Sequence, residues 1–95
     1  MFIVLLRFSA NKGRAAEFME GHKQWIRRGI EDGIFLLAGS LQPGLGGAII
    51  ALDTSHAALQ SRVDLDPFVT HDVVSAEILQ ITPSVADERL KFLLQ

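Results

Sequence analysis

The segment IFLLAGSLQPGLGGAIIALD, residues 34–53, decides the fold expected for this chain. Two short apolar runs, residues 34–41 and 48–53, have the length and the branched and aromatic content of β-strands. Between them, residues 42–47 contain a proline and several glycines, which is typical of a flexible turn. We therefore expect two consecutive strands at the centre of the chain.

A strand and a long helix are predicted before this strand pair. Residues 2–8, FIVLLRF, are branched and aromatic, which is typical of a buried strand. Over residues 14–32 apolar side chains recur at spacings of three and four, so they share one face of a helix. Gly33 ends this helix well, because glycine adopts the left-handed conformation without steric cost. The apolar positions of the helix are Ala15, Phe18, Met19, Trp25, Ile26 and Ile30.

A second helix and a fourth strand are predicted after the strand pair. Thr54 or Ser55 can cap a helix over residues 56–65, and residues 73–82 are predicted to form the strand. The order β-α-β-β-α-β is the ferredoxin-like pattern, an α+β fold with both helices on one face of an antiparallel sheet. With 95 residues the chain is expected to be a single domain, residues 1–95. Its core is residues 1–82, and residues 83–95 form a C-terminal helical extension.

Composition argues against several classes of function. The formal net charge is −2 and no basic helix face is visible, so nucleic acid is not an expected partner. The chain has no cysteine, which excludes a thiolate nucleophile and a disulfide. No apolar run approaches the roughly 20 residues that span a bilayer, and residues 1–8 lack the features of a signal peptide. We therefore expect a cytoplasmic protein without a membrane partner.

The first two predicted strands are apolar on both faces, although the helices would cover only one. An identical sheet from a second copy is the simplest cover for the other face, so at least a homodimer is expected. Alternatively, the C-terminal helix folds back, but a helix of roughly ten residues is short for four strands. The two faces are Phe2, Val4, Leu6 and Phe8 against Ile3, Leu5 and Arg7 in the first strand, and Phe35, Leu37 and Leu41 against Ile34, Leu36 and Ala38 in the second.

His22 is the most informative candidate for chemistry. It lies four residues from both Phe18 and Ile26, so it shares the apolar stripe of the first helix. A histidine there is partly desolvated and needs a hydrogen-bond partner. It is either a structural core histidine or a general acid/base, for which imidazole is well suited near neutral pH.

Asp66 is the second candidate. Because it precedes Pro67, it can cap a short helix after the second long one, and that role alone would explain it. A carboxylate near His22 would also orient the imidazole and stabilise its charged form. The spacing of 44 positions does not show whether the two residues meet.

Three further polar features of the sequence bear on function. Arg7 lies on the sheet face away from the helices, where it needs an anionic partner, either a carboxylate or a ligand, unless it stands at the exposed end of the strand. Ser40 lacks the surroundings of a nucleophilic serine. No recognised metal-ligand spacing is present, so no metal site is expected.

Four features together resemble the YCII-related family, over about residues 1–82. They are a histidine midway along the first helix (GHKQW, residues 21–25), LLAG at residues 36–39, the glycine pair Gly46-Gly47, and DPF at residues 66–68. The resemblance implies a ferredoxin-like protomer that dimerises sheet to sheet, as in the dimeric α/β barrels. It also implies a pocket holding a histidine–aspartate pair, which maps onto His22 and Asp66.

The resemblance implies cofactor-free proton transfer next to a carbonyl or enol, because one branch of the family is dehydrochlorinase-like. Phe68 of the DPF element, Ser40 and Arg7 are then candidate substrate-binding residues. The chain departs from the family at Ser40, where proline is usual, and a hydroxyl near the pocket would alter the ligand.

Three hypotheses about function follow from these residues. The first is a lyase- or isomerase-type enzyme, in which His22 is the general acid/base and Asp66 holds its tautomer. The second is a non-catalytic module that senses or carries a small metabolite in the same pocket. The third is a structural or assembly partner without a ligand. The reaction, and whether there is one, stays open at this point.

Overall fold

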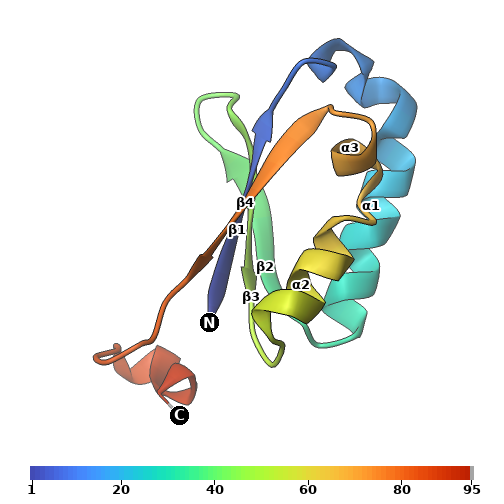
Figure 1. Cartoon of the computed structure of the whole chain (residues 1–95). Coiled ribbons are helices and arrows are strands. Elements are labelled where there is room, and N and C mark those ends of the chain that lie inside the picture. Colours follow the sequence, from blue (N-terminus) through green and yellow to red (C-terminus); the bar gives the residue numbers. More distant parts are fainter. Residues whose placement is uncertain (95) are drawn as a thin grey trace.

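The computed structural model describes residues 1–94 and contains one four-stranded sheet with helices packed on one of its faces (Figure 1). Two 3-10 helices, η1 and η2, accompany the longer elements. In chain order the elements are β1 (Phe2–Phe8), η1 (Lys12–Arg14), α1 (Ala15–Glu31), β2 (Phe35–Leu41), β3 (Gly46–Ala51), α2 (His56–Val63), α3 (Pro67–Thr70), β4 (Val74–Gln80) and η2 (Glu88–Leu93).

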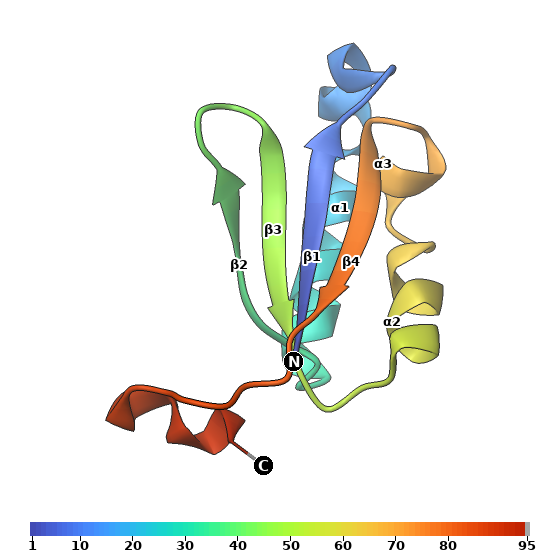
Figure 2. The same cartoon turned by 60° about the vertical axis from the view of Figure 1, so that its left-hand side comes forward.

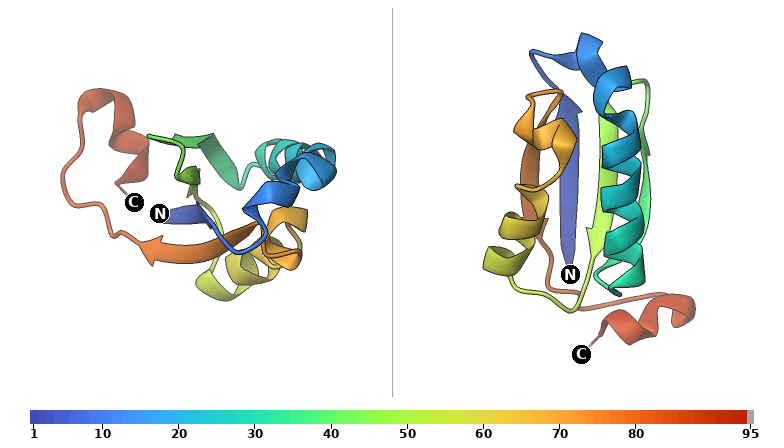
Figure 3. Two further views of the ribbon diagram at one scale, coloured as in Figure 1. Left: turned by 90° about the horizontal axis from the view of Figure 1, so that it is seen from above. Right: turned by 90° about the vertical axis from the view of Figure 1, so that its right-hand side faces the viewer.

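The sheet has the strand order β2-β3-β1-β4, and all neighbouring strands are antiparallel (Figure 2). α1 and the pair α2–α3 lie side by side over the same face (Figure 3). This is the predicted ferredoxin-like β-α-β-β-α-β fold, with both helical connections on one side of the sheet. The strands and long helices begin and end within three residues of the predicted bounds.

The core lies between the helices and this inner face of the sheet. β1 contributes alternate side chains to it, as its period of two requires. α1 approaches the sheet closely at Gly29, where a β-carbon would overlap the ring of Phe35. The buried core residues are Phe2, Val4, Leu6, Phe35, Ile49, Ala51, Leu59, Val63, Phe68, Val73 and Val74.

The predicted faces of the second strand were wrong from Leu37 onward. Phe35 pairs with Ala51 but Leu37 pairs with Ile50, so Leu36 is an extra residue in β2. Such a bulge reverses the alternation of the side chains that follow it. As a result, Leu37 is 58% exposed, whereas Ala38 packs against the core.

Much of the outer face of the sheet is apolar, as the sequence predicts, although the Arg7–Glu77 ion pair also lies on it. Leu36 and Leu79 are 46% and 40% exposed on the sheet, and Ile3 and Leu5 are half-buried. The C-terminal segment leaves β4 at the end of the sheet and extends away from the helical layer (Figures 1 and 3). It therefore does not cover these side chains, and a fold-back of the tail over the whole face is not observed.

The C-terminal helix expected from residue 83 onward is shorter than predicted. Residues 81–87 form no regular element, and Glu88–Leu93 form a 3-10 helix. Asp87 caps this helix by accepting a hydrogen bond from the Arg89 backbone N–H at 2.9 Å. No helix within residues 1–94 is long and apolar enough to cross a membrane.

Candidate functional site

A cavity of about 380 Å³ lies between α1 and the inner face of the sheet. Most of its wall is apolar, and three polar side chains, His22, Lys23 and Ser40, reach it. On the side of the sheet, glycine and alanine form part of the wall in place of larger residues. The larger apolar residues of the wall are Leu6, Phe8, Met19, Ile26, Ile49, Phe68 and Val74, and the small ones are Ala38, Gly39, Gly46, Gly47 and Ala48.

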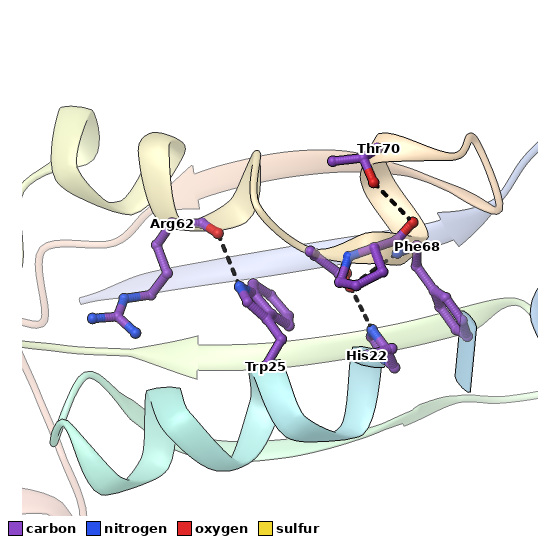
Figure 4. A network of polar contacts seen from close by, with 7 residues as sticks. His22, Trp25, Arg62, Phe68 and Thr70 are labelled. Carbon is purple, nitrogen blue, oxygen red and sulfur yellow. Dashed lines mark hydrogen bonds and ion pairs between the residues drawn. The ribbon is translucent and has the colours of Figure 1, made fainter. Parts of the chain in front are cut away.

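His22 lines this cavity and contacts Asp66. Figure 4 shows His22 pointing from α1 toward the segment that carries Phe68. His22 Nδ1 lies 2.8 Å from Asp66 Oδ1, a contact that the family resemblance implies and that the spacing alone left open. The His22 side chain is 13% exposed and the Asp66 side chain is fully buried. An ionised carboxylate can only accept hydrogen bonds, so beside an ionised Asp66 the proton of this contact belongs to Nδ1.

Asp66 occupies its position because it also caps α3. Its Oδ1 accepts a second hydrogen bond, from the backbone N–H of Phe68 at 3.0 Å, and Pro67 fills the first turn of the helix. The two interpretations left open for Asp66 are therefore compatible, because one oxygen atom makes both contacts. Oδ2 is buried without a hydrogen-bond partner among residues 1–94.

Two aromatic rings fix the orientation of the imidazole. The Phe68 ring is stacked on His22 with centroids 4.0 Å apart and planes 4° apart. Trp25, one turn further along α1, lies 5.9 Å from His22, and its Nε1–H donates to the Arg62 carbonyl at 2.9 Å. Figure 4 shows these side chains bridging α1 to α2 and α3. The ring is thus held by packing as well as by Asp66.

This arrangement leaves one ring nitrogen available for chemistry. His22 lines the cavity, and its Nε2 has no hydrogen-bond partner among residues 1–94. With Nδ1 donating to Asp66, Nε2 of the neutral ring carries a lone pair and can accept a proton. The Asp66 carboxylate would then lie beside the imidazolium that forms.

The other residues singled out from sequence lie in different places. Ser40 and Phe68 line the cavity. Arg7 does not: its Nη1 pairs with Glu77 Oε1 at 2.6 Å, and its side chain is 53% exposed. Arg7 projects from the outer face of β1, away from the cavity, and its anionic partner is a carboxylate of the neighbouring strand.

Sequence reasoning missed Lys23 as a cavity residue. Lys23 follows His22 directly and is four residues from Met19 and three from Ile26, both of which line the cavity. That spacing places Lys23 at the edge of the apolar stripe and was an available signal. Among residues 1–94, no three His, Asp or Glu side chains converge in a way that could hold a metal ion.

The fold and the cavity define a class of protein: a ferredoxin-like α+β domain with a histidine–aspartate pair beside a small apolar cavity. No protein-family model matches the chain, and no curated protein sequence matches it.

A solved structure shares the fold. It is 5-chloro-2-hydroxyhydroquinone dehydrochlorinase (TftG) from Burkholderia phenoliruptrix AC1100, in complex with 2,5-dihydroxybenzoquinone. The TM-score is 0.69, and the match covers 85% of this chain and 93% of that one at 13% sequence identity. At this identity the likeness concerns the fold alone. The likeness therefore agrees with the predicted ferredoxin-like fold, and membership of the YCII-related family stays a prediction from sequence.

Proposed function

We propose that this chain forms a homodimeric, cofactor-independent enzyme that transfers protons on a small cyclic or enolic molecule. The observation that carries the proposal is the pairing of a fully buried Asp66 with a His22 that lines an apolar cavity. Side chains arranged in this way are suited to general acid–base catalysis, because the carboxylate fixes the tautomer and stabilises the protonated ring.

In the proposed reaction Nε2 of His22 removes a proton from a carbon or hydroxyl group next to a carbonyl. The electron pair of the broken bond then forms an enolate, or, where chlorine stands on a saturated carbon of the ring in its keto form, it forms a new double bond as chloride leaves. The imidazolium returns its proton to another atom of the product or to water, which restores the neutral ring. Asp66 keeps its charge throughout, and Ser40 is placed to donate a hydrogen bond to a ligand oxygen.

The solved structure with the same fold supplies candidate ligands. That protein is described as a dehydrochlorinase and is bound to a dihydroxybenzoquinone. A cavity of about 380 Å³ is within the usual size range of small-molecule sites, roughly 300–1,000 Å³. We therefore propose oxygenated six-membered rings as the first compounds to test with this chain, including chlorinated hydroxyquinols.

The test compares turnover of a panel of these ring compounds by the wild-type protein and by His22→Gln. Absorbance and chloride release measure the turnover. We expect His22→Gln to lower turnover by about 10²–10⁴-fold, the usual contribution of a general acid–base. His56→Gln is the matched control, because His56 is exposed at the start of α2 and does not line the cavity. Equal turnover by wild type and His22→Gln would rule out the proposed role.

The second candidate is a binding module that carries or senses a metabolite in the same cavity. The cap that Asp66 provides to α3 favours it, since this structural role accounts for the aspartate without catalysis. Binding of panel compounds that depends on His22, with no turnover of any of them, would support this candidate over the enzyme. A protein that binds none of them would fit the third hypothesis, an assembly partner.

A further inference from the structure

We propose that Lys23 makes the cavity selective for small planar anions, such as phenolates, enolates or carboxylates, over neutral molecules of the same shape. The proposal rests on the proposed function, in that it takes this cavity to be the ligand site. It adds the charge of the ligand and the residue that recognises it.

Among the described residues, the cavity wall carries a positive charge and no negative charge. Within residues 1–94 the lining contains one ammonium group, one imidazole and one hydroxyl, from Lys23, His22 and Ser40, and no carboxylate. Asp66, the nearest acidic group to the imidazole, is fully buried behind His22 and does not line the cavity. A ligand anion therefore meets a cation and hydrogen-bonding groups without a competing negative charge.

The Lys23 ammonium is free to act on a ligand. It makes no ion pair or hydrogen bond with another of residues 1–94, whereas Arg7 is paired with Glu77 on the opposite face of the sheet. Lys23 is exposed, so its charge keeps its hydration when the cavity is empty. Its aliphatic stem can lie along Met19 and Ile26 while the ammonium reaches the cavity opening.

The position of Lys23 complements that of His22. The two residues are consecutive on α1 and both line the cavity. An anionic oxygen near the ammonium and a proton donor near Nε2 can therefore belong to the same small ring. The apolar wall around them lowers the local dielectric constant, which strengthens the attraction of the ammonium for an anion.

A matched pair of probes tests this inference: 2-hydroxybenzoate, an anion at pH 7.5, and 2-hydroxybenzamide, its neutral counterpart of nearly the same shape. Their dissociation constants are measured by ¹H–¹⁵N NMR titration of the full chain. We expect wild type to bind the anion about tenfold more tightly than the amide, as for one charge-assisted contact at a partly open site. This preference should fall with added salt.

The variant Lys23→Gln removes the charge and keeps a polar side chain. We expect it to bind the anion about tenfold more weakly and the amide as wild type does. Arg27→Gln is the matched control, because Arg27 is an exposed cation one turn further along α1 that does not line the cavity. It removes the same charge from the same helix and should leave both dissociation constants unchanged.

The outcomes separate this inference from the proposed function. If both probes shift cavity residues such as Met19 and Ile49 but bind equally well, Lys23 does not select for charge and the inference is wrong, while the ligand site stands. An equal loss of anion binding in Arg27→Gln would also overturn it, since the effect would then be the net charge of α1. If neither probe perturbs the cavity residues, both the inference and the proposed site fail.

Discussion

Asp66 Oδ1 accepts hydrogen bonds from two directions, from His22 Nδ1 at 2.8 Å and from the Phe68 N–H at 3.0 Å. Because α3 is only four residues long, this cap is a large part of what holds it in place. The same atom therefore positions Phe68, whose ring stacks on His22. One side chain sets both the orientation of the imidazole and the ring packed against it.

The first prediction concerns the tautomer of His22. Since Nδ1 donates to Asp66, the neutral ring should be protonated at Nδ1, whereas exposed His56 should favour the Nε2–H form. In Asp66→Asn the amide oxygen can still cap α3, but the loss of charge should raise the Nε2–H population of His22. Long-range ¹H–¹⁵N NMR at a pH where both rings are neutral measures this. An Nε2–H His22 in the wild type would contradict the geometry described above.

The second prediction concerns Phe68, which is 5% exposed and belongs to the core. Phe68→Ala should lower the free energy of unfolding by about 3–5 kcal/mol, as is usual for a buried phenylalanine. Phe68→Leu keeps most of the volume and should cost less, about 1–1.5 kcal/mol, yet it removes the stacked ring. Urea unfolding measures both. Equal stability of the three proteins would show that this ring does not support the site.

At the scale of the elements, α1 carries the cavity residues His22 and Lys23. It must therefore be held at a fixed distance from the sheet. Gly29 permits that distance, because a β-carbon there would overlap the Phe35 ring. Phe35 in turn lies in an edge-to-face contact with Trp25, with centroids 5.1 Å apart. The position of the helix and the orientation of the site thus depend on the same contact.

The third prediction is that Gly29→Ala destabilises the protein although alanine favours helices by about 1 kcal/mol over glycine. Overpacking against Phe35 should outweigh this gain and leave a net loss of about 1–2 kcal/mol. Gly21→Ala is the control in the same helix, since its β-carbon would come 3.1 Å from Pro67 Cγ, a much milder contact. For Gly21→Ala we expect a change in the free energy of unfolding near zero. Thermal and urea unfolding compare the two, and a stabilised Gly29→Ala protein would contradict the close approach.

The fourth prediction concerns the first turn of α1. Arg14 Nε donates to Glu17 Oε2 at 2.8 Å, and this hydrogen bond holds the pKa of Glu17 below its ordinary value. The stabilisation is therefore present above the unfolded-state pKa of Glu17 and is lost as the pH falls through the folded-state value. Arg14→Gln should return the pKa of Glu17 toward its ordinary value. A carboxyl-detected NMR titration that finds the same Glu17 pKa in both proteins would contradict this.

At the scale of the whole molecule, the two faces of the sheet differ in what covers them. Helices bury the inner face, while Leu36, Leu37 and Leu79 stay 46%, 58% and 40% exposed on the sheet. Side chains of this kind, gathered over strands β1 to β4, are typical of an interface between subunits. A second copy placed sheet to sheet would bury them and would face an identical apolar surface.

The fifth prediction is that the protein is at least a dimer at micromolar concentration, with a mass of about twice 10.4 kDa or more by light scattering. Leu37→Lys should shift it toward monomer or lower its solubility, because the interface would bury an unpaired charge. Leu65→Lys is the control, since Leu65 is 74% exposed beside the helices. A wild-type mass near 10.4 kDa alone would rule out the dimer.

The order of elements could be read from sequence because each element is encoded locally. The spacing of apolar residues in α1, the glycine at its end and the proline–glycine turn after β2 each fix the conformation of a few neighbouring residues. The inward direction of His22 follows from the same spacing. Asp66 was identified as a cap for a similar local reason, and resemblance to a family, not spacing, linked it to His22.

Only the tertiary structure decided the features that depend on two strands or on two distant segments. The bulge at Leu36 exists because β2 pairs with β3 in a shifted register, and an alternating sequence does not reveal where that shift occurs. Arg7 meets Glu77 because β1 and β4 are neighbours, which removes Arg7 from the cavity. The contact between His22 and Asp66 spans 44 positions, and Lys23 is recognised as a cavity residue only once α1 lies over the sheet. Periodicity specifies which face a residue occupies on its own element, whereas the groups it meets depend on how the elements pack.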